Sequence, residues 1–147
     1  MKKIGDYTMR GTCPGFDVLA GPKRLILDDG RFDTGYRVVR FEIATKDQTA
    51  TNVNLHAKLA TDELTVTAGG TWNWGDNREI AWSTDDHGSA TDEETMRSII
   101  DPDNLVIQDL FLYPDANNNT NYLIKLEKYQ FTDSLGALAM VRNRSQA

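Results

Sequence analysis

Arg37-Val-Val-Arg-Phe-Glu-Ile43 is a run in which apolar and charged side chains alternate. Successive side chains of a β-strand point to opposite faces of the sheet. Val39, Phe41 and Ile43 are therefore predicted on one face, and the charged side chains on the other. The run is typical of a strand that is buried on one side only.

The same alternation recurs in Val53-Asn-Leu-His-Ala-Lys-Leu59. The odd-numbered residues of this run are predicted to face the core, and His56 and Lys58 to face solvent. Leu105–Tyr113 is apolar almost throughout, which fits a central strand buried on both faces. Further strands are predicted at Lys23–Leu27, Leu64–Thr67 and Tyr122–Glu127.

The three tryptophans lie together in Thr71-Trp-Asn-Trp-Gly-Asp-Asn-Arg-Glu-Ile-Ala-Trp82. Gly75-Asp-Asn77 has the composition of a turn, so two strands and a hairpin or tight corner are predicted here. The indoles could form a core, a contact between subunits or a platform for a ligand. The predicted binding residues are Trp72, Trp74, Asp76, Asn77, Arg78 and Trp82.

Two helices are predicted. Thr91-Asp-Glu-Glu94 matches a capping box, which indicates a short helix over residues 92–100. Thr132-Asp-Ser134 precedes an apolar stripe at helical spacing. This C-terminal helix would pack across an open edge of the sheet or reach a neighbouring subunit.

The many strands without helical crossovers favour a mainly β fold, a β-sandwich or jelly roll with these two helices. The length of 147 residues predicts one domain, 1–147, in which residues 1–22 could form an extended N-terminal arm. The net charge of −6 and the lack of a basic stripe argue against nucleic acid as a partner. No stretch is long and apolar enough to predict a membrane span or a signal peptide.

The sequence predicts no catalytic residue, metal or cofactor. Cys13 is the only cysteine, which excludes an intrachain disulfide, and it is predicted in a turn. Glu42, Asp109 and Glu127 are the carboxylates of the predicted core strands, and nothing in the sequence pairs them. His87 lies beside two carboxylates in Ser83-Thr-Asp-Asp-His-Gly88, which could be a metal site. Because no second histidine follows at a regular spacing, an acidic loop is the preferred interpretation.

Three segments carry a resemblance to a known class of proteins. They are Asn73-Trp-Gly-Asp-Asn-Arg-Glu-Ile-Ala-Trp82, Asp101-Pro-Asp-Asn-Leu-Val-Ile-Gln-Asp-Leu110, and Tyr122-Leu-Ile-Lys-Leu-Glu-Lys-Tyr129 with the helix predicted after it. Through these three segments, the last half of the chain resembles small virion-associated β-proteins of tailed phages, especially those of marine hosts. The resemblance carries no catalytic residues.

The resemblance implies a non-enzymatic structural protein, such as a capsid decoration (cement) protein or another head or tail component. It implies an oligomer whose partners are further copies and other virion proteins. The protein would be made in the host cytoplasm and located in the virion. The alternative is a carbohydrate-binding β-sandwich module that holds a glycan on exposed tryptophans.

Overall fold

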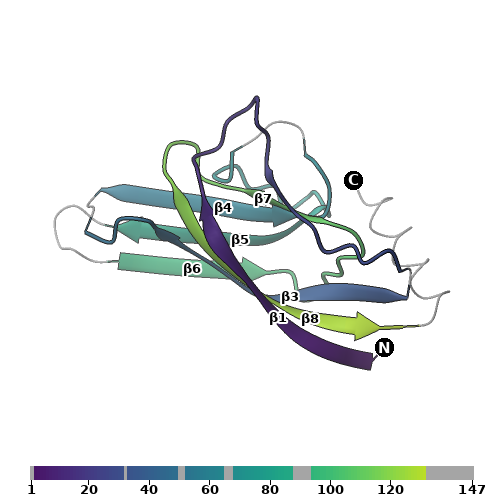
Figure 1. The fold of residues 1–147 in the computed structure, drawn as a ribbon. Helices are drawn as coiled ribbons and strands as arrows, with labels where there is room; N and C mark the ends of the chain where they lie inside the picture. Colours follow the sequence, from purple (N-terminus) through teal and green to yellow (C-terminus); the bar gives the residue numbers. More distant parts are fainter. Residues whose placement is uncertain (1, 32, 50–51, 65–67, 88–93, 132–147) are drawn as a thin grey trace.

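The computed structural model describes residues 2–31, 33–49, 52–64, 68–87 and 94–131. These residues form eight strands and no helix (Figure 1). The strands are β1 (Lys2–Cys13), β2 (Lys23–Leu25), β3 (Thr34–Thr45), β4 (Val53–Ala60), β5 (Glu79–His87), β6 (Glu94–Ile100), β7 (Leu110–Tyr113) and β8 (Thr120–Gln130).

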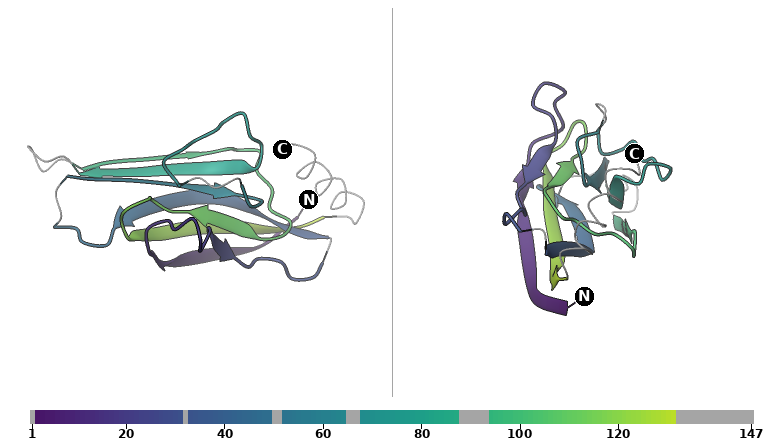
Figure 2. Two further views of the ribbon diagram at one scale, coloured as in Figure 1. Left: turned by 90° about the horizontal axis from the view of Figure 1, so that it is seen from above. Right: turned by 90° about the vertical axis from the view of Figure 1, so that its right-hand side faces the viewer.

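The strands form two antiparallel sheets. One has three strands in the order β1-β8-β3, and the other has five in the order β2-β7-β4-β5-β6. Figure 2 shows the two sheets as separate layers. The prediction of a mainly β fold is therefore confirmed.

Apolar side chains from both sheets meet in one core. Strands β3 and β8 contribute from the first sheet, and β4, β5 and β7 from the second. The buried members from these strands include Val38, Phe41, Ile43, Ile124, Leu126, Leu55, Leu59, Ile80, Leu110 and Leu112. Burial of these side chains is the main force that holds the two sheets together.

The sheets are also joined by hydrogen bonds along the side where β3 faces β5 and β6. The Ser98 hydroxyl donates to the Phe41 carbonyl at 2.5 Å. The Thr45 backbone N–H donates to the Asp85 carboxylate at 3.1 Å. Since both bonds cross between the sheets, they fix the register of β3 against β5 and β6.

A β-bulge in β3 changes which residues reach the core. Val38 pairs with Leu126 and Arg40 with Lys125, so Val39 is an extra residue without a partner on β8. Val38 is buried, whereas Val39 is exposed. The prediction that Val39 shares the inner face was wrong, because regular alternation does not survive an inserted residue.

The helix predicted over residues 92–100 is also wrong for its described part. Glu94–Ile100 is the strand β6, which pairs antiparallel with β5 along its whole length. The predicted C-terminal helix lies outside the described residues, as do residues 65–67 of the predicted strand Leu64–Thr67.

Two other segments differ from their predictions. Of residues 1–22, Lys2–Cys13 pairs with β8 as an edge strand instead of forming an arm, with an irregularity in the register between Lys3 and Gly5. Of Leu105–Tyr113, only Leu110–Tyr113 is the strand β7, and Val106 forms an isolated bridge to Tyr36 of β3.

Candidate functional site

Residues 68–78 fold back over the outer face of the five-stranded sheet. The Gly69 N–H donates to the Pro114 carbonyl at 2.8 Å, which fixes the segment beside the end of β7. The Lys58 ammonium donates to the Thr71 carbonyl at 2.6 Å, which fixes it to β4. We call residues 68–78 the tryptophan loop.

A buried ion pair lies under the tryptophan loop. The Nζ of Lys58 on β4 lies 3.2 Å from the Oε2 of Glu79 on β5, and Lys58 is 1% exposed. Glu79 also accepts hydrogen bonds from the Asn73 N–H and the Trp82 indole. The prediction that Lys58 faces solvent was wrong, because the loop covers that face of the strand. A buried pair of charges needs such additional hydrogen bonds to offset its lost hydration.

A second β-bulge makes the contact between Glu79 and Trp82 possible. Leu59 pairs with Ala81 and Ala60 with Glu79, so Ile80 is an extra residue in β5. In a regular strand, residues three apart face opposite sides. Here the Trp82 indole donates to the Glu79 carboxylate at 3.0 Å.

The three tryptophans have different surroundings. Trp82 is buried on β5, while Trp74 is 63% exposed and its ring centre lies 5.7 Å from that of Trp82. Trp72 is half-buried and donates its indole N–H to the Gly69 carbonyl at 2.8 Å. Ile80 and Trp82 lie on a strand, β5, as predicted. Trp72 and Trp74 are not in a strand, so the first strand predicted for this stretch, and the hairpin with it, is wrong.

The other predicted binding residues follow Trp74 in the tryptophan loop. Arg78 makes a 2.7 Å ion pair with Asp76, so its guanidinium is engaged by its own loop. Hydrogen bonds from Arg78 lower the pKa of Asp76 and keep it ionised. Asn77 is exposed. Of the six predicted residues, Trp74 and Asn77 are thus the exposed ones.

A second group of polar side chains gathers at the end of β5. Asp85 and His87 lie on β5, and Glu94 pairs with His87 from β6. The prediction of a loop over residues 83–88 is wrong as far as His87, because these residues continue the strand. Burial, and then the neighbouring Glu94, raise the pKa of Asp85. The spacing of Asp85 and His87 could be seen in the sequence. The contribution of Glu94 could not, because a helix was predicted for the segment that forms β6.

The remaining candidates from the sequence are separate from one another. Cys13 is the last residue of β1 and is buried in the core, where burial raises the pKa of its thiol. Glu42 pairs with Arg40, Asp109 with Arg24, and Glu127 with Lys3. His56 is partly exposed, and its ring nitrogen lies 4.0 Å from an Asp115 oxygen.

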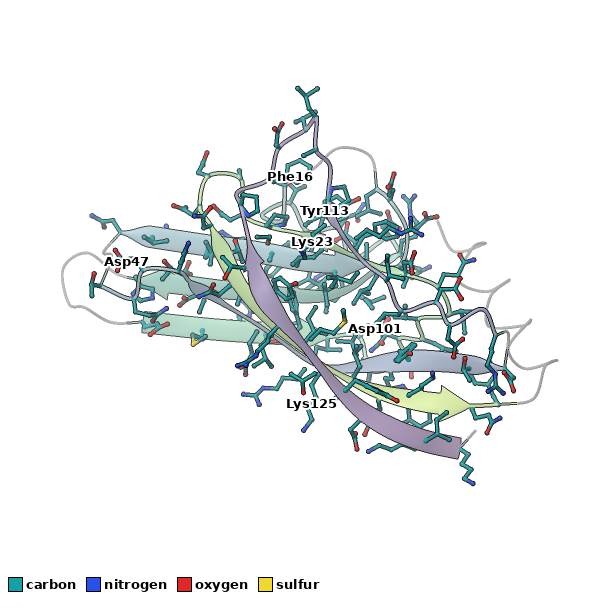
Figure 3. The ribbon with its side chains drawn as sticks, in the orientation of Figure 1. Phe16, Lys23, Asp47, Asp101, Tyr113 and Lys125 are labelled. Atoms are coloured by element: carbon teal, nitrogen blue, oxygen red, sulfur yellow. The ribbon has the colours of Figure 1, made fainter. Side chains whose placement is uncertain are left out.

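The loop between β1 and β2 projects from the body of the protein (top of Figure 1). At its base the Phe16 ring packs on Tyr113 with 5.9 Å between ring centres (Figure 3). The Phe16 N–H also donates to the Asp115 carbonyl at 2.7 Å. These contacts hold the base of the loop against the chain that follows β7.

The tip of this projecting loop is a closed turn. The Gly21 N–H donates to the Asp17 carbonyl at 2.8 Å, and the Leu19 N–H to the Asp17 carboxylate at 3.0 Å. Gly21 has a φ of 72°, which is strained for other residues. The turn presents Val18 and Leu19 to solvent, and Leu19 is 95% exposed. We call Val18 and Leu19 the apolar tip.

No family model, curated protein or solved structure matches this chain. The fold itself defines the class of this chain, which is a mainly β protein built from two antiparallel sheets. Among the described residues no helix is long and apolar enough to cross a membrane.

Proposed function

We propose that this chain is a non-enzymatic structural protein that assembles as an oligomer on a phage particle. The role would be that of a capsid decoration (cement) protein or another head or tail component. The apolar tip carries the proposal, because Leu19 is 95% exposed on a loop that its own contacts hold in shape.

An apolar tip of this kind suits insertion into a neighbouring protein. Burying an exposed leucine side chain contributes about 1.5–3 kcal/mol to association. The turn at Asp17 and Gly21 already orders the backbone, so less conformational entropy is lost on docking. Adjacent exposed apolar side chains, such as those of the apolar tip, are the kind of surface that marks a contact between proteins.

The edge strand β1 supports assembly independently. This strand of twelve residues pairs with β8 on one side, and no described strand pairs with the other side. Ile4 and Tyr7 are exposed along it. A long edge strand with free backbone groups can accept a strand from another chain. The net charge of −6 suits an outward surface more than one that faces DNA.

Light scattering of the purified chain over a range of concentrations tests this function. We expect an oligomer, and we expect Leu19→Ser to shift it toward the monomer. Ile26→Ser is the matched control, because Ile26 is also an exposed apolar residue but lies outside the apolar tip. A strict monomer with no affinity for phage particles would reject the proposal.

The second candidate function is a carbohydrate-binding module. The observation that favours it is Trp74, whose exposed ring is followed by the polar residues Asp76 and Asn77. Aromatic rings bind the apolar faces of sugars, while neighbouring polar groups accept and donate hydrogen bonds. A shift of tryptophan fluorescence with added glycans, absent in Trp74→Ala, would favour this function. An unchanged spectrum across a glycan panel would reject it.

The proposed assembly on a virion also implies where the protein acts and what it contacts. The partners are further copies and other virion proteins, with neither nucleic acid nor membrane, and no cofactor is part of the proposal. We propose a β-sandwich as the finer description of the fold, which the single core between two sheets supports. A panel of ester, phosphate and glycoside substrates tests the proposal that the chain is not an enzyme, and turnover of any of them would overturn it.

A further inference from the structure

We propose that Asp85, His87 and Glu94 bind one divalent transition-metal ion, with Zn²⁺ as the best fit. The strand register brings the three together. Asp85 and His87 are two residues apart on β5 and therefore share a face. Glu94 is the direct partner of His87 on β6, so its side chain lies on the same face.

The spacing of the donor atoms fits a metal ion. The His87 Nε2 lies 3.4 Å from the Asp85 Oδ2 and 3.3 Å from the Glu94 Oε1. One donor atom from each residue lies within 4.8 Å of the other two. Tetrahedral ligands at the usual zinc distances of about 2.0–2.2 Å are roughly 3.3–3.6 Å apart. The two short separations agree with that edge length.

Unsatisfied hydrogen-bonding groups point to a ligand independently of this spacing. The Asp85 side chain is 0% exposed, yet its Oδ1 has no hydrogen-bond partner. The His87 Nε2 is also buried and makes no hydrogen bond, although oxygens of Asp85 and Glu94 lie within 3.4 Å of it. Among the described residues, the one other such side-chain atom is Oδ1 of Asp86, the residue between them. A buried carboxylate oxygen without a hydrogen bond is costly, and a bound cation would remove that cost.

Charge supports the same conclusion. Asp85 and Glu94 place two carboxylates beside one imidazole, and like charges at short range repel each other. A divalent cation neutralises both carboxylates. The Thr45 N–H, which donates to Asp85 at 3.1 Å, would hold that ligand in position.

The donor set selects among metals. One imidazole nitrogen with two carboxylates suits Zn²⁺ and similar transition metals, whereas Mg²⁺ and Ca²⁺ prefer oxygen donors throughout. Three protein ligands leave a fourth tetrahedral position for water. The site lies where β5 ends and β6 begins (left of Figure 1). A metal there would tie these two strands together, and through Asp85 to Thr45 at the end of β3.

Titration calorimetry on the full chain, first freed of metal with a chelator, tests the site. We expect one Zn²⁺ per chain and much weaker binding of Mg²⁺. Asp85→Asn, His87→Gln and Glu94→Gln should each weaken zinc binding by at least about tenfold. Asp86→Asn should leave zinc affinity unchanged, because Asp86 is the adjacent residue of β5 and points to the opposite face.

Three results would overturn the proposal. They are a wild-type chain that does not bind Zn²⁺, three ligand variants that bind it like the wild type, and Mg²⁺ binding as tight as that of Zn²⁺. Circular dichroism shows whether each variant is folded. Glu94→Gln keeps the experiment decisive even if Asp85→Asn does not fold, since Glu94 is exposed on the edge strand β6. The site stands independently of the proposed assembly function.

Discussion

Replacing Gly69 with alanine tests whether the tryptophan loop is packed tightly on the sheet. A Cβ at this position would lie 2.2 Å from the Tyr113 carbonyl oxygen, 2.6 Å from the Ala57 Cα and 2.7 Å from the His56 carbonyl oxygen. All three atoms belong to the backbone of β7 and β4, so no side-chain rotation relieves the overlap. The loop would have to move away from the sheet.

The expected loss of stability follows from the contacts that this movement breaks. Overpacking costs about 1–3 kcal/mol. The hydrogen bonds of the Gly69 N–H to Pro114 and of the Trp72 indole to the Gly69 carbonyl would each add about 0.5–1.5 kcal/mol. We therefore expect a loss of roughly 2–6 kcal/mol in the free energy of unfolding.

Urea unfolding followed by circular dichroism measures this loss. Gly70→Ala is the matched control, because its Cβ would meet the nearest atom, the Cβ of His56, at an ordinary 3.7 Å. We expect this control to stay within about 0.5 kcal/mol of the wild type. Equal unfolding midpoints for the two variants would refute the reasoning that the loop is part of the packed structure.

Three other properties of the described residues lead to measurable outcomes. Lys58→Met should lower the free energy of unfolding in urea by about 3–5 kcal/mol, because it leaves Glu79 charged and buried without its partner. Adding Glu79→Gln should recover part of that loss, since it removes the buried charge. No recovery in the double variant would contradict the importance of the ion pair. Burial opposes ionisation of Asp109, but hydrogen bonds, the strongest from Arg24, outweigh burial and lower the pKa of this carboxyl group. The ionised carboxylate therefore stabilises the fold above about pH 4. This contribution disappears as the pH falls through the lowered pKa. Asp109→Asn should therefore lower the free energy of unfolding at pH 7. Between pH 5 and about pH 3 the variant should lose less of this free energy than the wild type does, as measured by urea unfolding. Parallel pH profiles for the two proteins would contradict the role of the Asp109 carboxylate. Acrylamide should quench tryptophan emission less in Trp74→Phe than in Trp82→Phe, since Trp74 is exposed and Trp82 is buried; the reverse order would show that the loop is differently placed.

Alternation in the sequence predicted most of the central strands, because burial on one face imposes a period of two. Alternation identified β4 and most of β3, whereas the near-continuous apolarity of Leu105–Tyr113 indicated β7. It could not locate the bulges at Val39 and Ile80, because an inserted residue has no signature in a single sequence.

The strand β6 shows how a local signal can mislead. The capping box at Thr91 and Glu94 indicated a helix, which is a statement about a few neighbouring residues. The segment that follows contains the β-branched residues Thr95, Ile99 and Ile100, which favour a strand. Pairing with β5 decides the outcome, and such tertiary contacts override local preference.

The candidate sites were predictable only in part. The concentration of tryptophans indicated an important region, but nothing in the sequence showed that Lys58 and Glu79 form a buried pair beneath it. The spacing of Asp85 and His87 was visible, whereas their approach to Glu94 depends on the register of β5 and β6. Contacts between distant residues follow from the topology, which local patterns do not contain.

Hydrogen exchange measured at low and high protein concentration tests most directly whether this chain assembles through its apolar tip. We predict that the backbone amides of residues 16–21 exchange more slowly in the concentrated sample, because docking of Val18 and Leu19 would cover the projecting loop. The amides of the central strands β4 and β5 should exchange equally slowly in both samples, since they are already protected within the sheet. Exchange in residues 16–21 that does not depend on concentration, in a chain that stays monomeric, would contradict the proposal.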